Sequence, residues 1–243
     1  MIASITGIGW VTAAGMGCGR KSGSFSMPAD NLPNITGTMV FGKPYKHFGR
    51  MDEYSRLGLS AIAFALKDAG LEKWKRKRDI GIIASTVYGC LHTDIDFFNT
   101  VIPDGGLMAS PNLFAYTLPN CFLGEAAIHF GLTGEGFVVN DPSHARLTSL
   151  QTALDIISSE ETKKMVCGVC DLGRPPIFGP GQDVPPGALF FVIEKSPESN
   201  LSVYGELSLD KDDSISFNKK KISDLTSLVN ECIAVHGLKL VGA

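Results

Sequence analysis

Ser143 is the residue of this sequence whose type and position most directly suggest covalent chemistry. It stands in the stretch GEGFVVNDPSHARLTSLQTALDII, residues 134–157, where a β-branched run meets a sharp turn at Asp141-Pro142-Ser143 and a helical pattern follows at once. Several enzyme families mount a nucleophile at such a strand–turn–helix junction. Ser143 is therefore a candidate nucleophile.

The same turn has a purely structural explanation. Asp is a favoured helix N-cap and Pro is favoured at the first helical position, so Asp141 and Pro142 predict a helix that starts here. A serine hydroxyl is a weak nucleophile near neutral pH unless a base adjoins it. A carboxylate at position 141 would also oppose a developing oxyanion. The residue types favour a helix start over a nucleophile, and both alternatives stay open.

The general base that Ser143 would need could be a histidine, because imidazole titrates near neutral pH. The candidates are His92, His129, His144 and His236. His129 has apolar neighbours on a predicted helix, which favours packing. His236 precedes Gly237 at a predicted helix end, where a histidine complements the helix dipole. His144 directly follows Ser143, and adjacent side chains on a helix diverge.

Cys167-Gly-Val-Cys170 has the spacing of a redox pair or half of a zinc site. A zinc site would need two more paired ligands, and the sequence does not place them. The pair also lies within a predicted strand, which favours small side chains packed in a sheet. We therefore expect no metal and no organic cofactor. The six cysteines are scattered along the chain, which is typical of reduced thiols in a cytoplasmic protein.

The bulk composition limits the classes of partner. The chain has 243 residues, 44% hydrophobic and 19% charged, with a net charge of -3, which argues against nucleic acid. No apolar run reaches the roughly 20 residues of a membrane span, and the N-terminus has no basic region typical of a signal peptide. The basic run Lys73–Arg78 could meet an acidic carrier protein or phosphate, although such runs, like Lys219–Lys221, are usually solvated linkers.

Alternating strand and helix patterns predict an α/β fold with a largely parallel sheet. Residues 2–11 read as the first strand, and Asp52 is placed to cap a helix that runs to Ala69. Further strands are predicted at 79–86, 137–140 and 164–171, with a short helix near 120–130. The strands GALFFVIEK and SVYGELSLD predict a hairpin-like pair. The last helix is expected to end at Gly237.

Several motifs, taken in order, resemble the N-terminal half of the β-ketoacyl synthase family, which has the thiolase-like fold. They are SITGIGWVTAAG, SRLGLSAIAFALKDAGL, IGIIASTVYG, SPNLFAYTLPNCFLGEAAIHFGLTGEG, VCGVCD and VPPGALFFVIEK. The similarity covers roughly residues 2–210 and comes from order and spacing together. It implies a mixed, mainly parallel five-stranded sheet with helices on both faces, and a single β-ketoacyl synthase N-terminal-like domain over residues 1–243.

Counted from Gly134 without a gap, Ser143 falls on the family's catalytic cysteine. That cysteine accepts the acyl chain from a carrier thioester, and two histidines from the second half of the fold assist decarboxylative condensation. We expect this chain to end where that second half would begin. The resemblance is closest to half-length chain-length-factor-like proteins. It implies a non-catalytic, ketosynthase-like partner subunit in fatty-acid or polyketide biosynthesis, of the aryl polyene type.

Two alternatives stay open beside that function. One is an acyltransferase or hydrolase that uses Ser143. The other is a non-catalytic homodimer that binds an acyl chain or a carrier protein. The resemblance also implies pairing through the strand that contains GFVVN, with a catalytic ketosynthase or a second copy, and contact with an acyl carrier protein. Phe114, Leu118 and Phe122 would then lie near the partner's acyl tunnel and limit chain length, although packing at an interface or in the core is the favoured interpretation.

Overall fold

The computed structural model describes residues 2–179, 184–197 and 202–241. Its centre is one nine-stranded sheet in the order β4-β3-β5-β6-β1-β7-β8-β9, with β2 paired to β1. The strands are β1 (Ile2–Thr12), β2 (Gly15–Cys18), β3 (Gly81–Thr86), β4 (Gly136–Asn140), β5 (Lys164–Asp171), β6 (Gly187–Glu194), β7 (Gly205–Leu209), β8 (Ile215–Phe217) and β9 (Lys220–Lys221). The helices are α1 (Gly37–Phe41), α2 (Glu53–Asp68), α3 (Leu91–Val101), α4 (Pro111–Phe114), α5 (Cys121–Phe130), α6 (Thr148–Ser158) and α7 (Leu225–Val241), with short 3-10 turns at Gly19–Lys21 and Phe48–Arg50.

The five strands β4-β3-β5-β6-β1 form the mixed core sheet that the sequence predicts. β3 is parallel to both β4 and β5, whereas β6 is antiparallel to β5 and to β1. Four of these strands therefore run in one direction and β6 runs against them. The prediction of an α/β fold with a mixed, mainly parallel five-stranded sheet is confirmed, and β2, β7, β8 and β9 extend that core.

The predicted hairpin between β6 and β7 is wrong. Both strands pair with β1, β6 along Ser4–Thr12 and β7 along Ile2–Ile5. β1 is 11 residues long, so it offers enough backbone for a partner on each side. Strand propensity identified both segments, but the choice of partner depends on contacts between residues far apart in the sequence.

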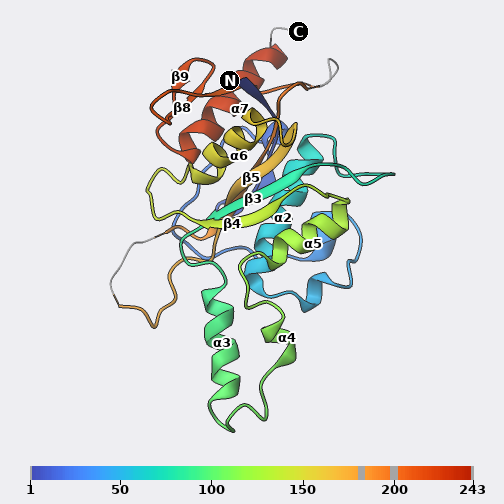
Figure 1. Cartoon of the computed structure of the whole chain (residues 1–243), viewed down its shortest axis with the longest axis vertical. Helices are drawn as coiled ribbons and strands as arrows, with labels where there is room; N and C mark the ends of the chain where they lie inside the picture. The colour runs from blue at the N-terminus through green and yellow to red at the C-terminus, as the bar shows by residue number, and fades with distance from the viewer. Residues whose placement is uncertain (1, 180–183, 198–201, 242–243) are drawn as a thin grey trace.

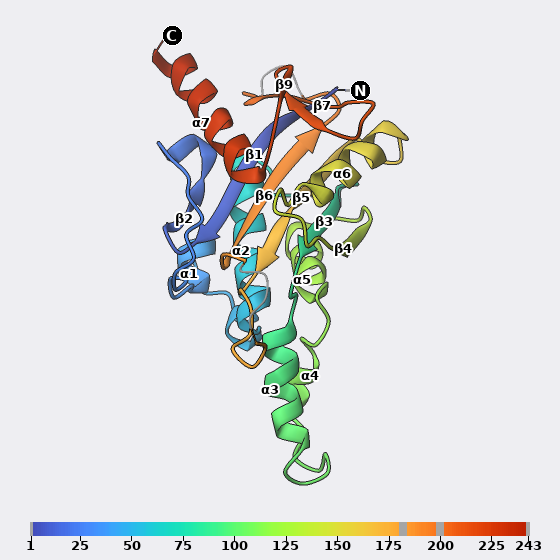
Figure 2. The ribbon, with the colours of Figure 1, turned by 90° about the vertical axis from the view of Figure 1, so that its left-hand side faces the viewer.

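Helices cover both faces of the sheet, as Figures 1 and 2 show, with α2 and α5 on one face and α6 and α7 on the other. α2 lies directly on β1 because the strand has glycines under the helix. A Cβ on Gly9 would lie 2.1 Å from the backbone nitrogen of Ala65. The predicted cap is confirmed, since the Asp52 carboxylate accepts the Ser55 amide at 2.9 Å. The TGIGW sequence therefore allows the helix to approach the sheet closely.

Two helix ends differ from the sequence predictions. α6 begins at Thr148, five residues after Ser143, because residues 141–147 form a loop around the Asp141 side chain. α7 continues through Gly237 to Val241, so Gly237 does not end it. Gly237 is outside the left-handed region that a terminating glycine adopts, which leaves it helical.

A helical arm, residues 91–118, carries α3 and α4 away from the sheet at the end where β3 finishes (Figures 1 and 2). Its surface carries several exposed apolar side chains, namely Phe98, Ile102, Leu107, Met108, Phe114 and Leu118. Leu107 is 88% exposed at the tip. Within the described residues, no helix is long and apolar enough to cross a membrane.

Candidate functional site

Ser143 lies in the loop between β4 and α6, and the Asp141 carboxylate organises that loop. Asp141 accepts hydrogen bonds from the Ser143 amide at 3.0 Å and the Ser143 hydroxyl at 2.5 Å. It also accepts the Thr148 amide, the first of α6, at 3.1 Å. Asp141 is buried while Ser143 is exposed. The prediction that Asp141 is the N-cap of a helix starting at Pro142 is wrong, because Leu147 is the N-cap of α6; the Asp141 carboxylate instead accepts the first α6 amide across seven residues.

The protonation state of Asp141 bears on whether it could activate Ser143. Burial acts to raise the pKa of Asp141, but the hydrogen bonds from Ser143 and Thr148 outweigh it and hold the pKa below its usual value. A carboxylate with a lowered pKa is a weak acceptor for a hydroxyl proton. The charge also occupies the positive end of α6, where a nucleophile would otherwise gain stabilisation. The short Ser143–Asp141 contact therefore holds the loop and does not activate the hydroxyl.

Asp171, at the end of β5, fastens this loop to the sheet. It is fully buried and accepts the Thr86 hydroxyl at 2.8 Å and the Val87 and Tyr88 amides at 3.0 and 2.9 Å. The Arg146 guanidinium forms an ion pair with the same carboxylate. Arg146 has a φ of 56°, which turns the loop toward α6. The sequence analysis predicted neither the role of Asp171 nor that of Arg146, although VCGVCD shows an acid at the end of an apolar strand.

None of the candidate histidines in the described part of the chain is hydrogen-bonded to Ser143. His92 Nε2 lies 3.2 Å from the Gly173 carbonyl. His129 packs on Phe41, with ring centroids 4.6 Å apart, and burial followed by the nearby Lys43 charge lowers its pKa. His236 lies against the Tyr204 ring. The predicted packing role of His129 agrees with these contacts, and His144 is exposed beside Ser143.

The Cys167–Cys170 pair does not form a metal or redox centre. Both thiols are free and fully buried, and burial raises the pKa of each. The two side chains also belong to opposite faces of the sheet, since Cys167 packs in the α6–α7 core and Cys170 in the α2–α5 core. Among the residues that the structure describes, no three potential metal ligands cluster.

The three residues predicted to limit chain length lie in different environments. Phe122 is fully buried, with its ring 5.3 Å from Tyr54 and 6.1 Å from Phe190. Phe114 and Leu118 are 63% and 62% exposed on the helical arm. Packing in the core, which the sequence analysis favoured, accounts for the position of Phe122. A contact between Phe114 or Leu118 and a partner's acyl chain stays a prediction.

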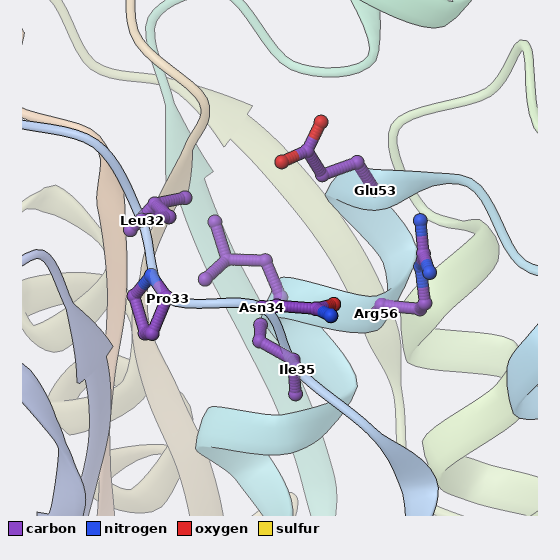
Figure 3. A pocket seen from close by; sticks show the side chains of 7 residues that line it. Leu32, Pro33, Asn34, Ile35, Glu53 and Arg56 are labelled. Carbon is purple, nitrogen blue, oxygen red and sulfur yellow. The ribbon is translucent and has the colours of Figure 1, made fainter.

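The cavity in Figure 3 does not involve any of these residues. It has a volume of about 240 Å³ and lies between the loop before α1 and the first turns of α2. Its lining is Leu32, Pro33, Asn34, Ile35, Glu53, Arg56 and Leu57. The cavity and the Ser143 loop are therefore lined by different segments of the chain.

Solved structures with this arrangement are thiolase-like ketosynthases. An ishigamide ketosynthase/chain length factor aligns with a TM-score of 0.64 and 19% identity, over 85% of this chain and 62% of the other. An AntDE ketosynthase, solved with the acyl-carrier protein AntF, aligns with a TM-score of 0.65 and 20% identity, over 87% and 70%. One chain of the complex of ketosynthase ApeO with its chain length factor ApeC from Xenorhabdus doucetiae aligns with a TM-score of 0.58 and 16% identity, over 98% of this chain and 91% of that one.

These likenesses define a protein of the thiolase-like ketosynthase fold. The family model for the β-ketoacyl synthase, N-terminal domain, matches residues 31–177, which is more than half of the chain. The chain belongs to that family. It spans less than two thirds of the ishigamide chain that it resembles. No curated protein sequence matches it.

Proposed function

We propose that this chain is a non-catalytic, ketosynthase-like partner subunit of the chain-length-factor type, acting in fatty-acid or polyketide biosynthesis of the aryl polyene kind. The observation that carries the proposal is the residue type at position 143 and the hydrogen bonds of its side chain. A serine stands there, its hydroxyl is bonded to the Asp141 carboxylate, and no histidine in the described residues is bonded to it. Removal of one member of a catalytic unit typically costs several powers of ten in rate.

The unpaired edge of β4 supports a partner that continues the sheet. The Ile82 amide donates to the Glu135 carbonyl and the Asp141 amide donates to the Thr86 carbonyl. In a parallel ladder only alternate residues of a strand bond to a given neighbour, so these two bonds imply that the backbone groups of Phe137 and Val139 also point toward β3. The N–H and C=O groups of Gly136, Val138 and Asn140 therefore point away from the sheet. Proteins rarely leave such an edge exposed, and a second ketosynthase-like subunit can pair with it across a two-fold or pseudo-two-fold axis.

The helical arm supplies apolar surface beside that edge. Exposed apolar patches of this kind typically mark protein–protein contacts. In our proposal the arm reaches the partner's acyl tunnel, where Phe114 and Leu118 limit the length of the growing chain. The ApeO–ApeC and AntDE–AntF complexes supply the kinds of partner, namely a catalytic ketosynthase and an acyl carrier protein. We further propose that residues 1–243 act as one domain and that the protein is cytoplasmic.

Co-purification with a catalytic ketosynthase from the same organism tests the partnership. We expect a heterodimer from co-expression, because pairing removes the β4 edge. Val138→Pro removes an outward N–H without breaking the bond to β3, and we expect it to abolish the heterodimer. Val138→Thr keeps the N–H and serves as the matched control. A stable homodimer that excludes the ketosynthase would contradict the proposal.

Intact mass spectrometry tests the catalytic alternative. The purified chain is incubated with an acyl thioester and a malonyl thioester, and both the protein and the products are weighed. We expect neither an adduct on Ser143 nor a product extended by two carbons. Acylation that disappears in Ser143→Ala would favour the acyltransferase or hydrolase instead. Extension by the chain alone would refute the non-catalytic role.

A further inference from the structure

The cavity in Figure 3 has one wall from α2 and one wall from the loop before α1. Its volume of about 240 Å³ lies below the roughly 300–1,000 Å³ of sites for drug-sized ligands, so it suits a small ligand. Both walls are fixed to the body of the protein. Ile35 of the loop is buried in the α2–α5 core, and the Asp52 carboxylate caps α2. The cavity is therefore formed before any ligand binds.

Three polar side chains line this cavity. Glu53 and Arg56 are three residues apart on α2 and so lie on the same side of the helix, while Asn34 faces them from the loop (Figure 3). Among the described residues, no side-chain hydrogen bond or ion pair includes the Glu53 carboxylate, the Arg56 guanidinium or the Asn34 amide. The cavity thus offers a ligand an anion, a cation and an amide at once.

Arg56 is the lining residue whose position the fold explains least. It lies near the N-terminus of α2, where the helix dipole favours anions and disfavours cations. Glu53, in the first turn, is stabilised by the same dipole without any ligand. The spacing of the two residues would allow an ion pair between them, yet none forms. An anion held in the cavity would give the Arg56 guanidinium the partner that the described chain does not supply.

The rest of the lining is apolar and consists of Leu32, Pro33, Ile35 and Leu57. Ile35 and Leu57 are buried, whereas Leu32 and Pro33 are half-buried. A ligand that carried only charged groups would leave this apolar surface in contact with water. An apolar group on the ligand would remove it from water, which is favourable.

We propose that this cavity binds a free α-amino acid with an apolar side chain. The ligand's carboxylate pairs with Arg56, which can donate two parallel hydrogen bonds to it. Its ammonium group pairs with Glu53, and the Asn34 amide can donate to the carboxylate or accept from the ammonium. The ligand's side chain lies against Leu32 and Leu57. A simple carboxylic acid would leave Glu53 without a partner and a simple amine would leave Arg56 without one, so a zwitterion fits the site best.

Isothermal titration calorimetry of the purified full chain tests the class of ligand. The first probes are L-leucine, 4-methylpentanoate, which lacks the ammonium group, and 3-methylbutylamine, which lacks the carboxylate. We expect saturable binding of L-leucine and at least about tenfold weaker binding of the other two, because each has only one of the two charged groups that the site pairs. L-valine, L-methionine and L-phenylalanine are titrated beside L-leucine, and glycine should bind more weakly because it has no side chain to bury.

Two conservative variants assign the two charges. In Arg56→Gln, L-leucine should bind at least about tenfold more weakly and should lose its advantage over 3-methylbutylamine. In Glu53→Gln, it should instead lose its advantage over 4-methylpentanoate. A merely structural role of the two residues would not change these two ratios separately. Glu72→Gln/Arg76→Gln removes the same two charges at exposed positions outside the cavity and should bind like the wild type.

Three results would overturn the proposal: no saturable binding of any of the four apolar amino acids, binding of the acid or the amine as tight as that of L-leucine, or an equal loss of binding in the control variant. None of the residues that line the cavity belongs to β4 or to the helical arm. All of these variants should therefore still co-purify with the ketosynthase, and a failure of this proposal is distinguishable from a failure of the proposed function.

Discussion

Phe122→Ala separates the packing role of Phe122 from a role in binding an acyl chain. The ring has no exposed surface and lies between Tyr54 and Phe190. It also touches α2, since a Cβ on Gly58 would lie 2.5 Å from it. A fully buried Phe→Ala change typically costs 3–5 kcal/mol. A rigid helix and a sheet strand bound the site, so little collapse can occur and we expect about 4 kcal/mol.

That loss is a large part of the roughly 5–15 kcal/mol that stabilises a typical domain. For a chain of this size it corresponds to a drop in melting temperature of roughly 8–16 °C. Urea unfolding followed by tryptophan fluorescence measures the change in free energy directly. Phe114→Ala is the matched control, because Phe114 is 63% exposed and its loss should change stability by about 0.5 kcal/mol or less. If both variants unfold at the wild-type urea concentration, Phe122 is not part of the core and the reasoning fails.

Two further predictions follow from the loop and from the thiols. Asp141→Ala should destabilise the protein by about 1–3 kcal/mol at pH 7, because it leaves amides of the loop and of α6 without an acceptor. Since the folded-state pKa of Asp141 is lowered, its stabilisation is complete above about pH 4 and is lost as pH falls through that lower pKa, so the variant and the wild type should converge in urea titrations at low pH. Iodoacetamide at pH 8 should label the native protein only at Cys121, the one thiol that is not buried, as peptide mass mapping would reveal. Burial raises the pKa of Cys90 to about 12 and also suppresses the other thiolates, so rapid labelling of Cys167 or Cys170 would contradict the assigned sheet packing.

The α2 region illustrates what local pattern can predict. Asp52, the apolar face and Gly70 are close together in the sequence, and each acts on its own helix through a short-range interaction. The structure confirms the helix over Glu53–Asp68, with Gly70 in the left-handed region. The order and spacing of the motifs likewise led to the correct family and core sheet, because they follow the succession of strands and helices along the chain.

The loop around Ser143 shows where local pattern fails. Asp141 and Pro142 have the residue types of a helix start, yet the helix begins at Thr148. The carboxylate gains three hydrogen bonds by closing the loop, and Arg146 is drawn to Asp171 on a strand 25 residues away. The spacing of the residues around position 143 reveals neither the loop that Asp141 closes nor the ion pair between Arg146 and Asp171.

The sequence by itself determined the strands β1, β3, β4 and β5, where α2 begins and ends, and that position 143 carries a hydroxyl. These properties depend on residue identity and on neighbours within one or two turns. Only the tertiary structure decided which strands flank β1, that Asp141 occupies the end of α6, that Phe122 is enclosed while Phe114 and Leu118 face outward, and that the basic run Lys73–Arg78 is anchored by hydrogen bonds from Trp74 and Arg78. Those outcomes depend on contacts between distant segments, and such contacts have no signature in local composition or periodicity.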